Sequence, residues 1–266
     1  MSERVAIVTG ASQGIGCAIS HTLAEAGTRL CLVAAPADED ALRSVAEALE
    51  AEHLAADIGE PETAGRAVEL AVRRFGRLDW VASNAGIAYF EDVLDAPLAH
   101  FDHTMHVNVR GMYLMVTEAA REMAKHGQGA IVCTASTASF AGEELQAVYN
   151  ASKGAVAQLA RSFAVDLARY GIRVNAVAPG WVRTPATEEI VANPADWSKH
   201  RSRIPMDRPA DPSEIAAVVR FLLSDEASYV TGSVVLVDGG LTAGYRFTDW
   251  DASARDDPPR APQLSA

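Results

Sequence analysis

The chain has 266 residues, which is enough for one large domain or two small ones. It carries 23 Lys and Arg against 35 Asp and Glu, a formal net charge of −12 at pH 7. This acidity argues against a sequence-independent nucleic-acid surface and against docking on anionic lipid, since both need an excess of positive charge. Hydrophobic residues make up 49% of the chain, but no apolar run reaches the roughly 20 residues that span a bilayer. We therefore expect an ordinary globular protein.

The cysteines and the first residues indicate a reducing compartment. Cys17, Cys31 and Cys133 are widely spaced within apolar runs, and no Cys-x-x-Cys pair is present. Such isolated cysteines are typical of buried thiols that stay reduced. Residues 1–9 lack the charged stretch and long apolar region of a signal peptide. We expect a cytoplasmic protein.

In chain order, short apolar runs alternate with longer amphipathic stretches. The predicted strands are residues 5–8, 30–33, 53–56, 78–82, 130–134, 173–178 and 234–237. The predicted helices are residues 15–26, 40–52, 61–75, 112–126, 149–170 and 212–223. The strands are apolar throughout, as expected for strands buried on both faces of a parallel sheet. The alternation predicts one α/β domain over residues 1–240, a doubly wound parallel sheet (Rossmann fold) with helices on both faces.

Two segments do not fit this alternation. Residues 181–208 are rich in proline and mixed charge, and they follow a strand at the end where ligands bind in such sheets. We interpret them as a substrate lid, with a plain connecting loop as the alternative. Residues 241–266 form a C-terminal extension that begins with scattered apolar residues and ends in a composition typical of a loose tail.

A glycine-rich segment follows the first predicted strand and opens the first predicted helix. In residues 9–16, Gly10, Gly14 and Gly16 have the spacing Gly-x3-Gly-x-Gly. Glycines let the backbone approach a pyrophosphate closely, and the helix N-terminus offers free N–H groups with a positive dipole. The segment predicts a dinucleotide site; a tight turn with packing glycines is the alternative.

Tyr149 and Lys153 are four residues apart, which places them on one face of a helix. A phenol has a pKa near 10 and is a poor base at neutrality, but a nearby ammonium lowers that pKa. The pair is therefore suited to exchange a proton with an alcohol or a ketone. Two residues on a solvated helix face are the alternative for this spacing taken alone.

Several motifs together resemble the short-chain dehydrogenase/reductase family over residues 5–240. They occur in the family's order: residues 9–16, Asp57, residues 83–86, Asn108, Ser136, Tyr149 with Lys153, Pro179 and Gly180 with Thr184, and residues 238–240. The resemblance implies hydride transfer between a nicotinamide cofactor and a secondary alcohol or ketone. It makes Tyr149 the general acid/base and places Ser136 on the substrate oxygen. It also places Lys153 on the nicotinamide ribose and gives Asn108 a water that links Lys153 to solvent.

The resemblance also assigns the cofactor contacts. These residues are Gly10, Ser12, Gln13, Gly14, Ile15, Gly16, Ala34, Asp57, Ile58, Asn84, Ala85, Gly86, Tyr149, Lys153, Pro179, Gly180, Val182 and Thr184. At the position that usually selects the cofactor, Ala34 is neither the acid of NAD enzymes nor the Arg of NADP enzymes. Asp38, Glu39 and Asp40 lie just beyond, and their charge would repel a 2′-phosphate. The sequence favours NAD(H) and leaves NADP(H) open.

The substrate is expected to be a small molecule such as a sugar, a polyol or a cyclic alcohol. The candidate substrate residues are Ser136, Phe140, Glu143, Glu144 and Trp181. No metal is expected, because His100, His103 and His106 diverge around a helix at their spacing of three. The resemblance implies a homo-oligomer, a tetramer or a dimer. Two alternatives stay open: an NADPH-dependent reductase of 3-ketoacyl-carrier substrates, and a non-catalytic nucleotide-sensing regulator.

Overall fold

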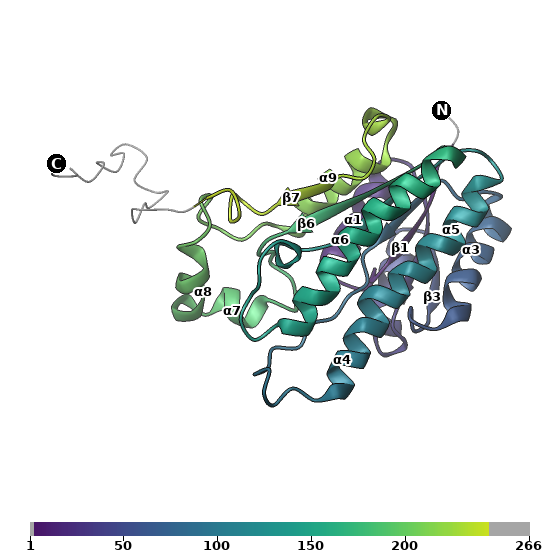
Figure 1. The fold of residues 1–266 in the computed structure, drawn as a ribbon. Helices are drawn as coiled ribbons and strands as arrows, with labels where there is room; N and C mark the ends of the chain where they lie inside the picture. The colour runs from purple at the N-terminus through teal and green to yellow at the C-terminus, as the bar shows by residue number, and fades with distance from the viewer. Residues whose placement is uncertain (1–2, 245–266) are drawn as a thin grey trace, which may run out of the picture.

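A computed structural model describes residues 3–244 and shows a single seven-stranded parallel sheet (Figure 1). The strand order is β3-β2-β1-β4-β5-β6-β7, so the chain winds outward from β1 in both directions. The strands are β1 (Val5–Thr9), β2 (Arg29–Ala34), β3 (Glu52–Ala55), β4 (Trp80–Ser83), β5 (Gly129–Thr134), β6 (Ile172–Pro179) and β7 (Val234–Val237). The predicted doubly wound α/β fold is confirmed.

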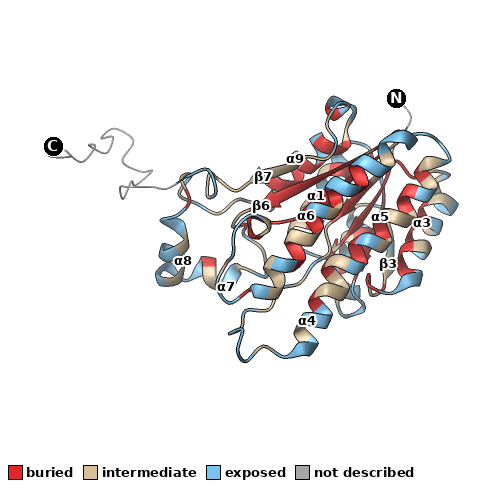
Figure 2. Ribbon diagram, viewed as in Figure 1, coloured by how far each residue is buried: buried red, intermediate tan, exposed pale blue. Residues whose placement is uncertain are grey.

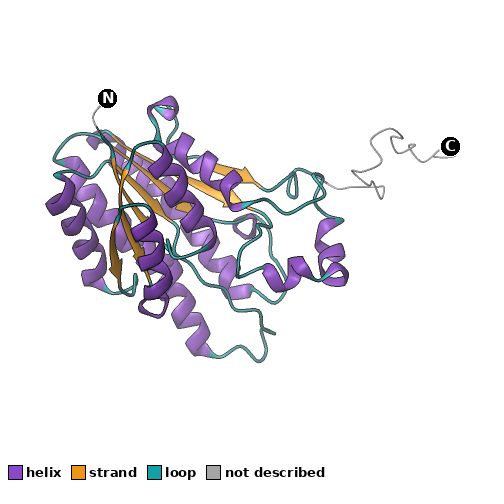
Figure 3. Cartoon of the chain, turned by 180° about the vertical axis from the view of Figure 1, so that it is seen from behind, coloured by secondary structure: helices purple, strands orange, loops and turns teal. Residues whose placement is uncertain are grey.

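Helices cover both faces of the sheet (Figure 3). One apolar core packs α3 (Pro61–Phe75), α5 (Met112–Ala124) and α6 (Ala147–Leu167) on one face. A second core packs α1 (Gly14–Glu25), α2 (Glu39–Ala48) and α9 (Pro212–Leu223) on the other.

The residues of β1 show why its sequence is apolar without alternation. Val5 and Ile7 belong to the first core, whereas Ala6 and Val8 belong to the second. Successive side chains of a strand point to opposite faces, so a strand covered on both sides needs apolar residues at every position. In Figure 2 the central strands are accordingly buried between the two helix layers, whereas the edge strands β3 and β7 have no fully buried residue.

The structure adds elements that the sequence pattern does not predict. Residues 181–208 hold α7 (Glu188–Ala192) and α8 (Pro194–Arg201). Asn193 begins α8 by accepting the N–H of Ala195, but none of the helix's residues is buried, so the helix has no apolar periodicity to detect. A further helix, α4 (Leu98–Met105), runs directly into the π-helical turn η2 (His106–Gly111). The short 3₁₀ turns are η1 (Pro36–Asp38), η3 (Thr137–Ser139), η4 (Ala168–Tyr170) and η5 (Asp225–Ala227).

Most of the predicted C-terminal extension, residues 245–266, lies outside the described residues. Up to residue 244 the chain continues in a turn in which Asp238 accepts the hydroxyl of Thr242 at 2.6 Å. Across residues 3–244, no helix combines the length and the apolar character needed to cross a membrane.

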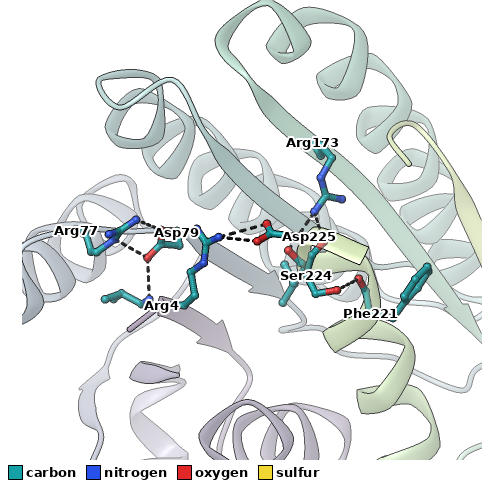
Figure 4. A network of polar contacts seen from close by, with 9 residues as sticks. Arg4, Arg77, Asp79, Arg173, Phe221, Ser224 and Asp225 are labelled. Atoms are coloured by element: carbon teal, nitrogen blue, oxygen red, sulfur yellow. Dashed lines mark hydrogen bonds and ion pairs between the residues drawn. The ribbon is translucent and has the colours of Figure 1, made fainter. Parts of the chain in front are cut away.

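A buried carboxylate anchors the amino edge of the sheet (Figure 4). Asp79, only 3% exposed, precedes β4 and accepts the N–H of Val5 at 2.9 Å and the guanidinium of Arg77 at 2.8 Å. Arg4 bridges Asp79 at 3.3 Å to Asp225 at 2.9 Å, just beyond α9. The network thus joins the start of β1 to β4 and to the end of α9.

Arg173 of β6 completes this edge by capping α9. Its guanidinium donates to the carbonyl oxygens of Leu222 at 2.7 Å and Ser224 at 2.9 Å. The last carbonyls of a helix have no partner within the helix, so Arg173 satisfies groups that would otherwise be buried unpaired.

We expect Asp79→Ala to lower the free energy of unfolding by about 2–3 kcal/mol, because it leaves a buried N–H and two guanidinium groups without their acceptor. Urea denaturation measures the change. Asp225→Ala is the matched control: this side chain is 86% exposed, and its loss is expected to cost less than about 1 kcal/mol. Equal losses in the two variants would contradict the role given to Asp79.

Candidate active site

The glycine-rich turn between β1 and α1 is packed tightly against the end of β4. Gly10 has φ +66°, and a Cβ on it would lie 2.9 Å from the Cα of Ala85. A Cβ on Gly16 would lie 2.0 Å from the carbonyl oxygen of Gly10. These contacts forbid side chains at both positions, so the packing role considered as an alternative is present. The absence of a Cβ at these two positions also leaves the backbone of the turn accessible at the carboxyl edge of the sheet.

The N-terminus of α1 has the properties of an anion site. Gln13 precedes the helix in an extended conformation, and its side chain makes no capping hydrogen bond. No acidic residue lies in the first turn, which begins at Gly14 and Ile15. The first N–H groups of a helix have no partner within the helix, and the dipole favours a negative charge there. These residues fit the pyrophosphate of a dinucleotide.

The carboxyl ends of β1, β4 and β5 are joined through Asn84. Its Nδ2 donates to the carbonyl of Thr9 at 3.2 Å, and its Oδ1 accepts the hydroxyl of Thr134 at 3.1 Å. The Thr9 hydroxyl in turn accepts the N–H groups of Asn84 at 2.9 Å and Ala85 at 3.0 Å. The Asn84 side chain is therefore engaged by the protein itself, so a ligand here meets chiefly the backbone of residues 84–86.

The predicted catalytic side chains come together at this same edge. Ser136 follows β5 and lies beside Tyr149, whose pKa it lowers, while Tyr149 and Lys153 lie one turn apart on α6. The Lys153 Nζ lies 5.6 Å from the centre of the Tyr149 ring and donates to the carbonyl of Thr134 at 2.8 Å. A group that contacts both Ser136 and Tyr149 would thus also lie near a buried ammonium.

Burial dominates the protonation of this pair. It raises the pKa of Tyr149, and the negative charge of Glu143 adds to that rise, against a hydrogen bond from Ser136 that lowers it. Burial also lowers the pKa of Lys153 to about 8. The pKa of Tyr149 is therefore raised in the cofactor-free protein, against the expected lowering, because desolvation outweighs the lowering by Ser136.

Asn108 lies in the π-helical turn η2 and is 1% exposed. Its Oδ1 accepts the N–H of Ile87 at 2.8 Å, while its Nδ2 donates to the carbonyl of Ile87 and to the Ser152 hydroxyl, both at 2.9 Å. It therefore ties the segment after β4 to the residue next to Lys153. Single π turns inside helices are frequent at functional sites, and here the turn carries the predicted asparagine.

At the adenine end, Asp57 has two protein partners. One carboxylate oxygen accepts the N–H of Gly59 at 2.9 Å, and the other lies 3.1 Å from Nε2 of His106. Burial raises the pKa of Asp57, but these two contacts outweigh it and hold the pKa below its ordinary value. Ile58 is buried and a Cβ on Gly111 would press against its side chain at 2.7 Å.

The three histidines each have a polar or stacking partner. His106 gathers with Asp57 and Glu60, and their ligand atoms lie within 4.8 Å of one another, a potential metal-binding group within residues 3–244. His100 stacks on Tyr89 at 3.8 Å between ring centres, and the Tyr89 hydroxyl meets His103 at 2.8 Å. Sequence spacing missed these groups because their partners are distant in the chain.

An acidic side chain reaches the glycine-rich turn from an unexpected position. Ala34 ends β2 with 4% exposure and offers no polar atom in its side chain. Asp38, in η1, instead brings a carboxylate oxygen to 3.5 Å from the Ser12 hydroxyl. The contact is long, but it places a negative charge beside the turn that follows β1.

The segment after β6 lies against the glycine-rich turn. Gly180 donates its N–H to Val237 at 3.1 Å, and Val182 pairs with Ala210 in an isolated bridge. A Cβ on Gly14 would lie 3.3 Å from Thr184, so this segment lies directly over the glycine-rich turn.

Within residues 181–208, Trp181 packs on His200 with 4.1 Å between ring centres and meets Trp197 edge-on at 6.0 Å. Sequence analysis singled out Trp181 but not its two partners on α8. The predicted Phe140 is 48% exposed, and Glu144 is also exposed.

Ser136, Tyr149 and Lys153 thus gather near a glycine-rich turn at the carboxyl ends of a parallel sheet, an arrangement typical of dinucleotide-dependent oxidoreductases. A family model described as "Enoyl-(Acyl carrier protein) reductase" matches residues 10–242. L-rhamnose 1-dehydrogenase (NAD(P)(+)) from Sphingomonas sp. (strain SKA58) is 38% identical over 91% of this chain and 97% of its own length.

Two further relatives agree with it. Cis-4-hydroxycyclohexanecarboxylate dehydrogenase from Sinomonas cyclohexanicum is 39% identical over 91% of this chain and 98% of its own length. A solved short-chain type dehydrogenase/reductase from Mycobacterium ulcerans has a TM-score of 0.87 at 29% identity, over 91% of this chain and 90% of the other. The chain belongs to the short-chain dehydrogenase/reductase family. It is an NAD(P)-dependent oxidoreductase that acts on CH–OH groups.

We expect Lys153→Met to raise the free energy of unfolding of the cofactor-free protein by about 1–3 kcal/mol at pH 7, because it removes a buried charge. The folded-state pKa of Lys153 is about 8 and its ordinary value is 10.5. Below pH 8 the folded wild type therefore carries the full free-energy cost of burying the charged ammonium of Lys153. Between pH 8 and 10.5 the folded form releases the proton, and the advantage of the variant shrinks.

Urea denaturation at pH 7 and pH 9.5 measures both effects. Lys125→Met is the matched control, since its ammonium is exposed and pairs with Glu122 at 2.6 Å. We expect a change below about 1 kcal/mol for that variant. A Lys153→Met protein less stable than wild type at pH 7, or an advantage that grows with pH, would contradict the buried charge.

Proposed function

We propose that this enzyme transfers a hydride between a nicotinamide cofactor and a ring-borne secondary alcohol or ketone, with Tyr149 as the general acid/base. The observation that carries the proposal is the placement of Ser136 beside Tyr149, next to the buried ammonium of Lys153. The cofactor, when bound, supplies the hydride acceptor or donor. Ser136 holds the substrate oxygen and Tyr149 exchanges the proton at its phenolic oxygen.

Lys153 serves the same step through its charge. An ammonium near the ring favours the phenolate, which opposes the effect of burial once a substrate alcohol and the cofactor occupy the site. Asn108 positions this group by holding Ile87 and Ser152, the neighbour of Lys153. The order along the site is then cofactor, Lys153, Tyr149 and substrate oxygen.

The cofactor is held in three places in this proposal. The glycine-rich turn and the first N–H groups of α1, with Ser12 and Gln13, bind the pyrophosphate. Asp57 and Ile58, with the backbone of residues 84–86, hold the adenine and its ribose. Pro179, Gly180, Val182 and Thr184 cover the nicotinamide side.

We propose NAD(H) as the preferred cofactor because Asp38 takes over the role that an acid at Ala34 would have. Its carboxylate lies near Ser12, close to where the adenine ribose approaches the turn. A carboxylate accepts the ribose 2′-hydroxyl and repels a 2′-phosphate.

Asp38→Asn removes this charge at nearly constant shape. We expect the ratio of kcat/KM for NADP⁺ to that for NAD⁺ to rise at least about tenfold, which corresponds to about 1.4 kcal/mol. Asp40→Asn is the control, since Asp40 pairs with Arg43 on the exposed surface of α2. An unchanged ratio in Asp38→Asn would remove Asp38 from cofactor selection, and tighter NADP⁺ than NAD⁺ in the wild type would overturn the preference.

We propose a small cyclic substrate, a sugar or a cyclic alcohol, on the strength of the two named relatives. It lies between Ser136 and residues 181–208, which act as a lid, with Trp181, Phe140 and Glu143 as walls. The catalytic domain comprises residues 1–240. The exposed Glu144 is left outside the proposed site.

A reductase of carrier-bound 3-ketoacyl chains is less well supported. Such a carrier favours free cations near the mouth, but four of the five Lys and Arg side chains in residues 181–208 have acidic partners. These pairs are Arg183 with Glu188, Lys199 with Asp196, Arg201 with Asp207, and Arg208 with Glu214. The presence of Ser136, Tyr149 and Lys153 together also disfavours a non-catalytic regulator.

We further propose a cytoplasmic homotetramer, with a homodimer as the alternative. The three cysteines are free thiols, which suits a reducing compartment. The outer faces of α5 and α6 carry exposed apolar side chains, among them Tyr113 and Val165, which a second copy of the chain would cover.

Tyr149→Phe removes the hydroxyl but keeps the ring. We expect it to lower kcat by at least about a hundredfold, because proton transfer at this oxygen is lost. Nicotinamide absorbance at 340 nm with cyclic alcohols and ketones measures turnover, and protein fluorescence measures the cofactor Kd, which should stay within about twofold. Turnover retained by the variant would contradict the proposed mechanism.

A further inference from the structure

Glu143 lies on the segment between η3 and α6, and its carboxylate is only weakly engaged. One oxygen accepts the Thr137 hydroxyl at 3.3 Å, and the other accepts the Gln146 side-chain amide at 3.2 Å. Hydrogen bonds to a carboxylate are normally about 2.5–2.9 Å long. The backbone is held more firmly, since the Glu143 carbonyl accepts the Asn150 side chain at 2.8 Å. The carboxylate is thus fixed in place with acceptor capacity to spare.

This carboxylate also has no cationic partner. Among residues 3–244, no Lys, Arg or His nitrogen lies within 4.0 Å of it. Glu91, on the neighbouring segment, shows the contrast: it meets His100 at 2.6 Å. A half-buried charge without a counter-charge or short hydrogen bonds is costly unless a bound group supplies donors.

A substrate group that donates a hydrogen bond to Glu143 would lie close to the reacting oxygen. The partners of Glu143 flank the catalytic side chains, because Thr137 directly follows Ser136 and Asn150 directly follows Tyr149. Its negative charge also acts on His200 of α8. His200 in turn packs on Trp181, which lies at the start of the lid. A substrate held between Tyr149 and the lid therefore has a carboxylate at its edge and an aromatic wall beyond it.

We propose that Glu143 is a specificity-determining residue that accepts a hydroxyl group on the carbon next to the reacting one, so that the enzyme selects vicinal diols. Each carboxylate oxygen keeps a free lone pair, and a hydroxyl is the donor that a neutral cyclic substrate offers there. The aromatic pair of Trp181 and His200 covers the C–H face of the ring. This inference rests on the proposed function and adds the substrate class to it.

Two substrates that differ by one hydroxyl test the proposal. With NAD⁺, we expect kcat/KM for cis-1,2-cyclohexanediol to exceed that for cyclohexanol at least about tenfold, since a site built around a substrate hydroxyl discriminates against its absence. Glu143→Gln should reduce this ratio about tenfold. Glu144→Gln, the exposed neighbour, should leave the ratio unchanged. Comparing ratios cancels any effect of the Glu143 charge on Tyr149, which acts on both substrates.

A binding measurement separates this proposal from the mechanism. In Tyr149→Phe with NAD⁺ bound, tryptophan fluorescence gives Kd for the diol and for cyclohexanol, and the diol should bind about tenfold tighter. Adding Glu143→Gln should abolish the difference. If Tyr149→Phe still turns over while the diol preference persists, the mechanism fails and the role of Glu143 stands.

Three outcomes would overturn the role of Glu143. The first is a wild-type enzyme with equal kcat/KM and equal Kd for the diol and cyclohexanol. The second is a Glu143→Gln variant that weakens both substrates by the same factor, which indicates an effect through Tyr149. The third is a preference for 2-aminocyclohexanol over the diol, which would make Glu143 an ammonium site.

Discussion

The active site depends on the way in which Asn84 ties three parallel strands together at their carboxyl ends. Its amide joins the end of β1 at Thr9 to the end of β5 at Thr134. In a parallel sheet all strands end at the same edge, so the groups that follow them meet there. The glycine-rich turn follows β1, Ser136 follows β5, and the lid follows β6. Any displacement of the β4 end would therefore misplace the cofactor site and the proton-transfer group together.

Desolvation governs the chemistry that this edge supports. Lys153 is 4% exposed and Tyr149 is partly buried at this edge, so desolvation shifts the pKa of both groups. Burial moves their pKa values in opposite senses, toward the neutral form of each. Two groups held close to neutrality in a dry site are suited to pass a proton once a substrate and a positively charged cofactor ring enter. In the cofactor-free protein, the buried charge of Lys153 lowers the free energy of unfolding.

The lid side of the site follows a different principle. On the cofactor side, polar side chains such as Asn84 and Asn108 have their donors and acceptors engaged by hydrogen bonds within the protein. Around the substrate, Glu143 has only long ones, and Trp181 with His200 presents an aromatic surface. Because the pyrophosphate and adenine are constant, their site can be preorganised in full. The substrate site instead leaves one charged acceptor to be satisfied by the ligand, which is how a polar pocket rejects molecules that lack the matching donor.

The sequence alone determined the sheet, the order of its strands along the chain, the glycine-rich turn and the Tyr149–Lys153 pair. Each of these is a local pattern within a few residues, and local patterns report local structure. Only the tertiary structure brought Asp38 to Ser12, His106 to Asp57, and His200 toward Glu143. These partners lie on different elements, so no spacing in the chain records their contact. The direction of the Tyr149 pKa was likewise decided in three dimensions, because it depends on how much water the fold excludes.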